Sequence, residues 1–147
     1  MHVPIPDLAA LARLAAGLAA RARPGDAILL EGPLGAGKTA FARAFLRAAS
    51  GDAGLEVPSP TFTLVQSYET RRGPVHHFDL WRLDGPGALA ELGWDELSGD
   101  IVLVEWPDRL GYLRPADALT ITLAPAGGEA REAVLAGWAD RLAGVGA

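Results

Sequence analysis

The stretch that decides the fold is Gly32-Pro33-Leu34-Gly35-Ala36-Gly37-Lys38-Thr39. It matches the pattern G-x-x-x-x-G-K-[S/T] at every fixed position. Its glycines let the backbone curl so that N–H groups point inward at phosphate oxygens, and the N-terminus of a following helix adds partial positive charge. Lys38 would reach the terminal phosphates and the Thr39 hydroxyl would bind Mg²⁺. The sequence therefore predicts a site for a nucleoside triphosphate with magnesium.

The segments on both sides of this loop have the secondary structure that it requires. Residues 27–30 are a short apolar run of the kind found in buried strands, and a helix is predicted from the loop to about Ala49. Nearer the N-terminus, Asp7 is a plausible N-cap for a helix whose leucines recur at helical spacing from Leu8 to Leu18. The loop is therefore expected to join a buried strand to a helix.

The rest of the chain adds strands around this unit. Residues 61–69 and 75–80 are predicted to form a hairpin, with a turn between them, and a short helix is expected at 84–92. Residues 101–104 are a further apolar strand, and late strands are expected at 118–123 and 129–135. The expected fold is a three-layer α/β/α P-loop NTPase in a single domain, residues 1–147. Its central sheet is expected to be mostly parallel, with an antiparallel hairpin.

Two carboxylates follow predicted strands and are candidates for catalysis. Glu105 ends an apolar strand as a Walker-B acid does, and it could contact Mg²⁺ directly, contact it through water, or orient the attacking water. Asp79 is the second candidate, although an aspartate at this point could also cap a turn. Together with Lys38, these two residues form the predicted catalytic set, and Thr39 and Glu105 are the predicted metal ligands.

Four other residues have open interpretations. Ser59 and Thr61 follow a long loop and could close over the γ-phosphate, or they could form a turn with locally bonded hydroxyls. His77 shares a strand face with Asp79, but no third ligand is in view, so a hydrogen-bonded histidine is favoured over a transition-metal site. Trp106 could pack on the nucleotide, but packing against the sheet is commoner.

Composition limits the partners and the nucleotide. The net charge is −5 and no run is strongly basic, which disfavours strong direct binding of RNA. The chain has no cysteine, which excludes disulfides and thiolate metal sites, and neither a signal peptide nor a spanning segment is recognisable. A cytoplasmic location is therefore expected. Lys38 is the only lysine and asparagine is absent, so the Asn-Lys-x-Asp motif that reads guanine is missing and ATP is favoured.

Four blocks occur in an order that is found in a known family. They are Leu34-Gly35-Ala36-Gly37-Lys38-Thr39, Ser59-Pro60-Thr61-Phe62-Thr63-Leu64-Val65, His77-Phe78-Asp79-Leu80-Trp81-Arg82-Leu83 and Leu103-Val104-Glu105-Trp106-Pro107. In this order they resemble the TsaE (YjeE) family, the bacterial ATPases of tRNA threonylcarbamoyladenosine synthesis. One departure is Trp81, which stands where tyrosine is usual.

This resemblance implies a function. TsaE-like proteins bind ATP and Mg²⁺, hydrolyse ATP slowly and act with the TsaB–TsaD pair, which modifies adenosine 37 of tRNAs that read ANN codons. The ATPase would reset or remodel that pair, and it would meet tRNA only through the complex. The free chain is expected to be a monomer. The resemblance implies ATP contacts from Gly35, Ala36, Gly37, Lys38, Thr39 and Ala40. Weaker matches place Asp7, Ala130 and Arg131 at the base or ribose.

Two alternatives remain open. The chain could be a small-molecule or nucleotide kinase in which Asp79 is the base, although the arginine-rich lid of such kinases is represented only by Arg71-Arg72. It could also be a switch in which nucleotide controls partner docking without a need for hydrolysis. No arginine finger can be assigned from the sequence, and Arg82 and Arg109 are the candidates within the chain.

Overall fold

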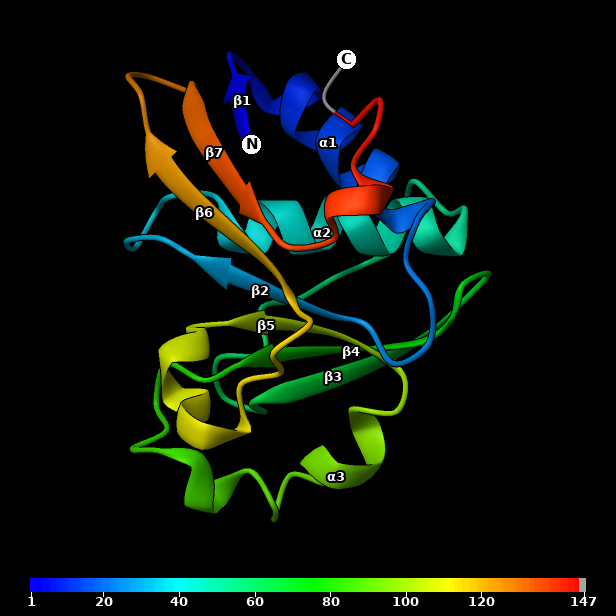
Figure 1. Ribbon diagram of the computed structural model, residues 1–147, viewed down its shortest axis with the longest axis vertical. Coiled ribbons are helices and arrows are strands. Elements are labelled where there is room, and N and C mark those ends of the chain that lie inside the picture. The colour runs from blue at the N-terminus through cyan, green and yellow to red at the C-terminus, as the bar shows by residue number, and fades with distance from the viewer. Residues whose placement is uncertain (146–147) are drawn as a thin grey trace.

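The computed structural model describes residues 1–145, which place seven strands in one sheet in the order β1-β7-β6-β2-β5-β4-β3 (Figure 1). The strands are β1 (His2–Ile5), β2 (Ala27–Glu31), β3 (Val65–Thr70), β4 (Gly73–Asp79), β5 (Ile101–Glu105), β6 (Leu119–Pro125) and β7 (Arg131–Ala136). The α-helices are α1 (Leu8–Ala19), α2 (Lys38–Ser50) and α3 (Trp94–Leu97). The 3₁₀ turns are η1 (Pro86–Ala88), η2 (Pro107–Leu113) and η3 (Ala139–Arg141).

The centre of the sheet is parallel and its margins are antiparallel. β2 pairs in parallel with β5 and with β6, and β4 pairs in parallel with β5. The β3–β4 hairpin and the β1–β7–β6 meander are antiparallel. This arrangement confirms the predicted P-loop NTPase fold. Register places Glu105 beside both Leu30 and Asp79, so the two predicted carboxylates meet where the phosphate-loop strand ends.

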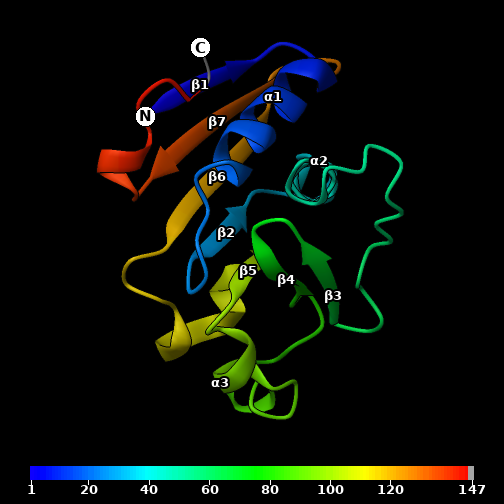
Figure 2. The ribbon, with the colours of Figure 1, turned by 90° about the vertical axis from the view of Figure 1, so that its right-hand side faces the viewer.

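Helical elements pack on both faces of the sheet and form two apolar cores (Figure 2). On one face α1 and α2 bury large side chains such as Leu18, Phe41 and Phe45. On the other face, Phe78 packs edge-on against Trp94 of α3, with ring centroids 5.2 Å apart. Burial of one such side chain is worth about 1.5–3 kcal/mol, so the two cores hold the sheet firmly from both sides.

The helix ends follow the sequence signals. Asp7 caps α1 by accepting a 2.8 Å hydrogen bond from the Ala10 N–H, as predicted. α2 begins directly after Gly37, whose φ is +103°, and it has no side-chain cap. The first N–H groups of a helix lack partners within the helix. Those of α2 therefore remain available to a ligand.

The structure differs most from the sequence prediction at three elements. The strand expected from residue 61 begins only at Val65, because Leu64 has a φ of +68° and its N–H bonds to the Pro60 carbonyl at 2.6 Å. The helix expected at 84–92 is reduced to the 3₁₀ turn η1, and α3 follows as a separate short helix after Gly93, whose φ is +80°. β1 was not predicted, because four residues containing a proline give little strand signal.

No helix within residues 1–145 has both the length and the apolar character needed to cross a bilayer.

Candidate nucleotide site

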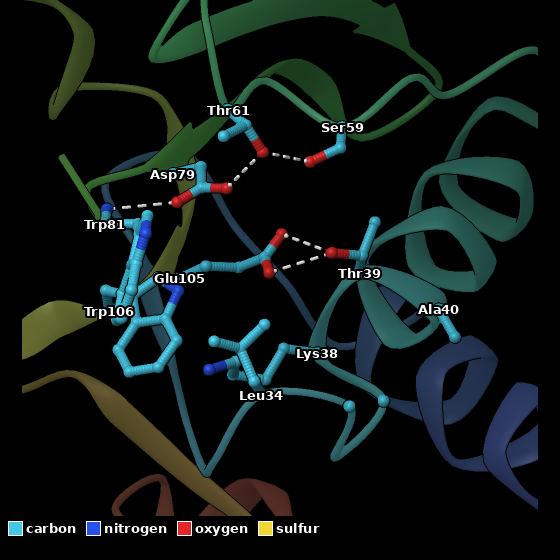
Figure 3. A pocket seen from close by; sticks show the side chains of 12 residues that line it. Leu34, Lys38, Thr39, Ala40, Ser59, Thr61, Asp79, Trp81, Glu105 and Trp106 are labelled. Atoms are coloured by element: carbon cyan, nitrogen blue, oxygen red, sulfur yellow. Dashed lines mark hydrogen bonds between the residues drawn. The ribbon is translucent and has the colours of Figure 1, made fainter.

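A cavity of about 430 Å³ opens beside the start of α2 and the carboxyl ends of β4 and β5 (Figure 3). Ligands of open α/β sheets bind at this edge of the sheet. Most of the predicted site residues line the cavity: Gly35, Gly37, Lys38, Thr39, Ala40, Asp79 and Glu105, together with Ser59 and Thr61. The structure therefore brings together residues that lie up to 70 positions apart in the chain.

Two glycines of the phosphate loop are required for different physical reasons. A Cβ on Gly32 would lie 2.4 Å from the Leu123 carbonyl oxygen, so β6 leaves no room for a side chain there. Gly35 has a φ of +79° and faces open space, so here the backbone conformation alone favours glycine. Within the loop, the Ala36 N–H bonds to the Pro33 carbonyl at 3.1 Å. The loop is a curled backbone with room for an anion on its open side.

Lys38 is held at the floor of the cavity. Its Nζ donates a 2.6 Å hydrogen bond to the Gly32 carbonyl and lies 3.3 Å from the centre of the Trp106 ring. Burial lowers the pKa of Lys38 from its usual 10.5, and the carboxylates of Glu105 and Asp79 oppose that shift. An ammonium group in this position is well suited to bind a phosphate that replaces the carbonyl as its partner.

Thr39 and Glu105 converge from α2 and β5. The Thr39 hydroxyl lies 2.9 Å from Glu105 Oε1 and 3.2 Å from Oε2, and only 2% of Glu105 is exposed. Within residues 1–145, there is no cluster of three or more histidine or acidic side chains that could hold a metal ion. Mg²⁺ is usually held by one or two protein oxygens together with waters and substrate phosphates. The hydroxyl and carboxylate oxygens of this pair fit that requirement.

The two histidines of β4 point to opposite faces of the sheet. Fully buried His77 has its Nε2 atom 2.7 Å from Glu105 Oε2. His76 instead lies between Ser67 Oγ, 2.7 Å from its Nδ1, and Asp100 Oδ2, 2.8 Å from its Nε2. Both residues are therefore the hydrogen-bonded strand histidines that the sequence favoured.

Asp79 has both of the roles that the sequence left open. Its Oδ1 accepts the Trp81 N–H at 3.0 Å, which caps the turn after β4. Its Oδ2 accepts the Thr61 hydroxyl at 3.0 Å, and Thr61 Oγ1 is 2.8 Å from Ser59 Oγ. Figure 3 shows this chain of oxygens across the cavity from Thr39. Asp79 therefore links the loop of residues 59–63 to the floor of the site.

Two tryptophans line the cavity, and the sequence indicated only one of them as a possible site residue. The rings of Trp81 and Trp106 lie 4.4 Å apart and both line the cavity (Figure 3). Trp106 was singled out in the sequence, but Trp81 was not singled out as a site residue. The only available signal was its place two residues after Asp79, where a turn brings it back over the strand end.

Several predicted residues lie elsewhere. The Ala36 side chain is completely buried beneath the loop, and Asp7 caps α1 without reaching the cavity wall. Arg131 contacts the loop without lining the cavity, with Nε donating to the Ala36 carbonyl at 3.0 Å and an Nη group 3.4 Å from the Gly35 carbonyl. Ala130 belongs to the turn before β7. Contacts of Asp7, Ala130 and Arg131 with base or ribose stay predictions.

The two arginine-finger candidates also lie outside the cavity lining. The Arg82 guanidinium lies over the Phe62 ring, 4.5 Å from its centre. Arg109 pairs with Asp108 at 2.8 Å. Neither side chain is therefore placed to touch a phosphate in this conformation.

Comparison with known proteins identifies the family of this chain. The model of the family described as "Threonylcarbamoyl adenosine biosynthesis protein TsaE" matches residues 5–133. A tRNA threonylcarbamoyladenosine biosynthesis protein TsaE from Rickettsia felis is 38% identical over 112 residues, which are 76% of this chain and 65% of that protein. The protein of the same name from Bacillus subtilis is 37% identical over 120 residues, which are 78% of this chain and 71% of that protein.

A solved structure gives the same result for the fold. The crystal structure of YdiB from Bacillus subtilis superposes with a TM-score of 0.74 at 30% identity, and the match covers 92% of this chain and 83% of that one. The match spans slightly less than two thirds of two curated Rickettsia relatives, 65% and 63% of their lengths. The family match nevertheless extends over most of the chain, from β1 to β7. The chain belongs to the TsaE family.

Proposed function

We propose that this chain is a Mg²⁺-dependent ATPase required for N6-threonylcarbamoyladenosine formation at position 37 of tRNA. The observation that carries the proposal is the 2.9 Å contact between Thr39 and Glu105, in the same cavity as the Lys38 ammonium and the curled phosphate loop. A triphosphate with Mg²⁺ is bound by a cationic side chain, by oxygen ligands for the metal and by free N–H groups at a helix N-terminus, and this cavity has all three. The names of its relatives, tRNA threonylcarbamoyladenosine biosynthesis proteins, support the choice of pathway.

Each part of the site would have its own role in the binding of Mg²⁺–ATP. The N–H groups at the start of α2 would receive phosphate oxygens, and the Lys38 ammonium would exchange the Gly32 carbonyl for a phosphate oxygen. Thr39 and Glu105 would hold Mg²⁺, which neutralises charge on the phosphates when bound. The loop of residues 59–63 would then sense the terminal phosphate through Thr61, which already contacts Asp79.

Hydrolysis would need a carboxylate to orient a water. Asp79 and Glu105 are neighbours across β4 and β5, and both line the cavity, so either can face the terminal phosphate. Among residues 1–145, no arginine lines the cavity, so we propose that the free protein lacks an arginine to stabilise the transition-state charge. Arginine fingers contribute about 10³–10⁵-fold to such reactions, so we propose slow turnover that depends on a partner.

The partners follow from the family. We propose that TsaB and TsaD carry out the transfer, that ATP binding and hydrolysis here reset or remodel their complex, and that tRNA is met through them in the cytoplasm. The net charge of −5 supports this division, because a phosphate-binding surface for tRNA would need basic residues.

Reconstitution with TsaB, TsaD and tRNA tests the proposal. Wild-type protein should support many rounds of modification per complex, with release of inorganic phosphate from ATP. Glu105→Gln should still bind ATP, because Lys38 and the loop are intact, but should stop the cycle after the first round. Full cycling by Glu105→Gln would favour a nucleotide-controlled switch, and a phosphorylated acceptor in place of inorganic phosphate would favour a kinase.

A further inference from the structure

The Glu105 carboxylate is held from two sides. Thr39 contacts it from α2, and His77 contacts Oε2 from β4 with its Nε2 atom, at 2.7 Å. The side chain of His77 is 0% exposed and that of Glu105 is 3% exposed, so water competes little for this hydrogen bond. A hydrogen bond to a carboxylate in such a setting is stronger than an ordinary one.

The surroundings of His77 decide which ring nitrogen carries the proton. Its Nδ1 atom is buried and has no hydrogen-bond partner within the described residues. A proton on Nδ1 would leave a buried N–H without an acceptor, which costs more than a bare lone pair, and Nε2 would then face the carboxylate without a proton. The proton therefore belongs on Nε2, where it is donated to Glu105 Oε2.

We propose that His77 is a positioning residue for Glu105, an inference that rests on the proposed ATPase function. By donating from Nε2 to Oε2, His77 fixes the rotation of the carboxylate, in which Oε1 is the oxygen nearer to the Thr39 hydroxyl, at 2.9 Å against 3.2 Å for Oε2. Groups that orient a ligating carboxylate commonly contribute about 10–100-fold to metal affinity or activity. His77 does not line the cavity, so it would act through Glu105.

The chain offers a matched control for this residue. His76 is adjacent on the same strand, is also buried and is also hydrogen-bonded, but it faces the opposite side of the sheet and contacts Ser67 and Asp100. Replacing either histidine perturbs β4 and removes hydrogen bonds. Only replacement of His77 changes the support of Glu105, so a difference between the two variants separates positioning from stability.

The kinetic experiment compares three variants with the wild type. Glutamine can place an N–H near the position of histidine Nε2, whereas leucine cannot. His77→Leu should lower kcat for ATP hydrolysis by about 10–100-fold and raise the Mg²⁺ concentration for half-maximal rate, while the Kd for ATP changes less than about threefold. His77→Gln should recover most of kcat, and His76→Leu should keep kcat near the wild-type value even if its Tm falls.

A measurement without nucleotide or metal gives a second readout. Long-range ¹H–¹⁵N spectra of the wild-type protein should show His77 protonated at Nε2 and bare at Nδ1, and Glu105→Gln should shift that Nε2–H resonance. A proton on Nδ1, or equal kcat in His77→Leu and His76→Leu, would overturn the inference. Absence of hydrolysis by the wild-type protein would instead contradict the proposed function, so the two failures can be told apart.

Discussion

The ammonium group of Lys38 lies 3.3 Å from the centre of the Trp106 ring, and the same nitrogen donates to the Gly32 carbonyl. Trp106 reaches this position because it directly follows Glu105 and has a φ of +61°, a conformation that few bulky residues adopt. A strained residue against the phosphate-binding lysine links the end of β5 to the phosphate loop.

Nucleotide binding should change the environment of Trp106. A triphosphate would draw Lys38 away from the Gly32 carbonyl and out of its contact with the ring, which is worth about 0.5–2 kcal/mol. Titration with Mg²⁺–ATP should therefore change the tryptophan fluorescence of the wild-type protein. This fluorescence change should be largely lost in Trp106→Phe. It should be retained in Trp138→Phe, because Trp138 does not line the cavity. An unaltered fluorescence change in Trp106→Phe would contradict this prediction, because the change would then arise at another tryptophan, such as Trp81 in the same cavity.

Thr39 should set the dependence on magnesium. Thr39→Ala removes a predicted metal ligand and a hydrogen bond to Glu105, whereas Thr39→Ser keeps the hydroxyl. We expect Thr39→Ala to lower the ATPase rate at least about tenfold at millimolar Mg²⁺, with Thr39→Ser close to the wild type. Titration of the rate with Mg²⁺ at saturating ATP measures the effect. A Thr39→Ala curve that overlays the wild type would remove Thr39 from the metal site.

Arg131 should act on the phosphate loop and not on the base. Its guanidinium does not line the cavity and donates to the Ala36 carbonyl at 3.0 Å, which would stabilise the loop in its curled conformation. Arg131→Met should therefore weaken the binding of ATP and of inorganic tripolyphosphate by a similar factor. This factor is about 5–30-fold if the lost hydrogen bonds are worth about 1–2 kcal/mol. Isothermal titration with both ligands measures the ratio. Loss of affinity for ATP alone would support the base contact that the sequence resemblance implies.

Two loop glycines should respond differently to alanine. In Gly32→Ala the new Cβ would lie 2.4 Å from the Leu123 carbonyl oxygen, which forces β2 and β6 apart. In Gly35→Ala nothing lies within 4 Å, and only the positive φ of +79° is unfavourable. We expect Gly35→Ala to lose about 1–2 kcal/mol of unfolding free energy and Gly32→Ala to lose more. Urea denaturation of both variants checks the order, and equal losses would contradict it.

Much of the fold could be predicted from local sequence, because the signals were local. The eight residues from Gly32 fix a strand, a loop and a helix together, and the apolar run before Glu105 identifies the neighbouring strand. The late start of β3 could not be predicted, because it occurs at Leu64, which has a φ of +68° and whose carbonyl accepts the N–H of Asp79 at the end of β4. Propensity alone counts such residues as strand formers.

The site was predictable in its loop and strand ends but not in its supporting contacts. The sequence favoured a hydrogen-bonded histidine at position 77 but did not identify Glu105 as its partner. Its contact with Glu105 depends on the register of β4 against β5, which pairs His77 with Leu103 and Asp79 with Glu105. Arg131 reaches the loop across 95 residues, because β6 and β7 bring the end of the chain back beside β2. Contacts of this kind follow from topology, which single residues do not encode.

The most direct measurement is the affinity of Mg²⁺–ATP for the Lys38→Ala protein by isothermal titration calorimetry, with circular dichroism to verify the fold. Removal of the one ammonium group at the phosphate loop should weaken binding by about 10–150-fold, since a hydrogen bond to a charged group is worth about 1.5–3 kcal/mol, and should abolish hydrolysis. A correctly folded Lys38→Ala protein that binds ATP as tightly as the wild type would contradict the assignment of this cavity as the triphosphate site.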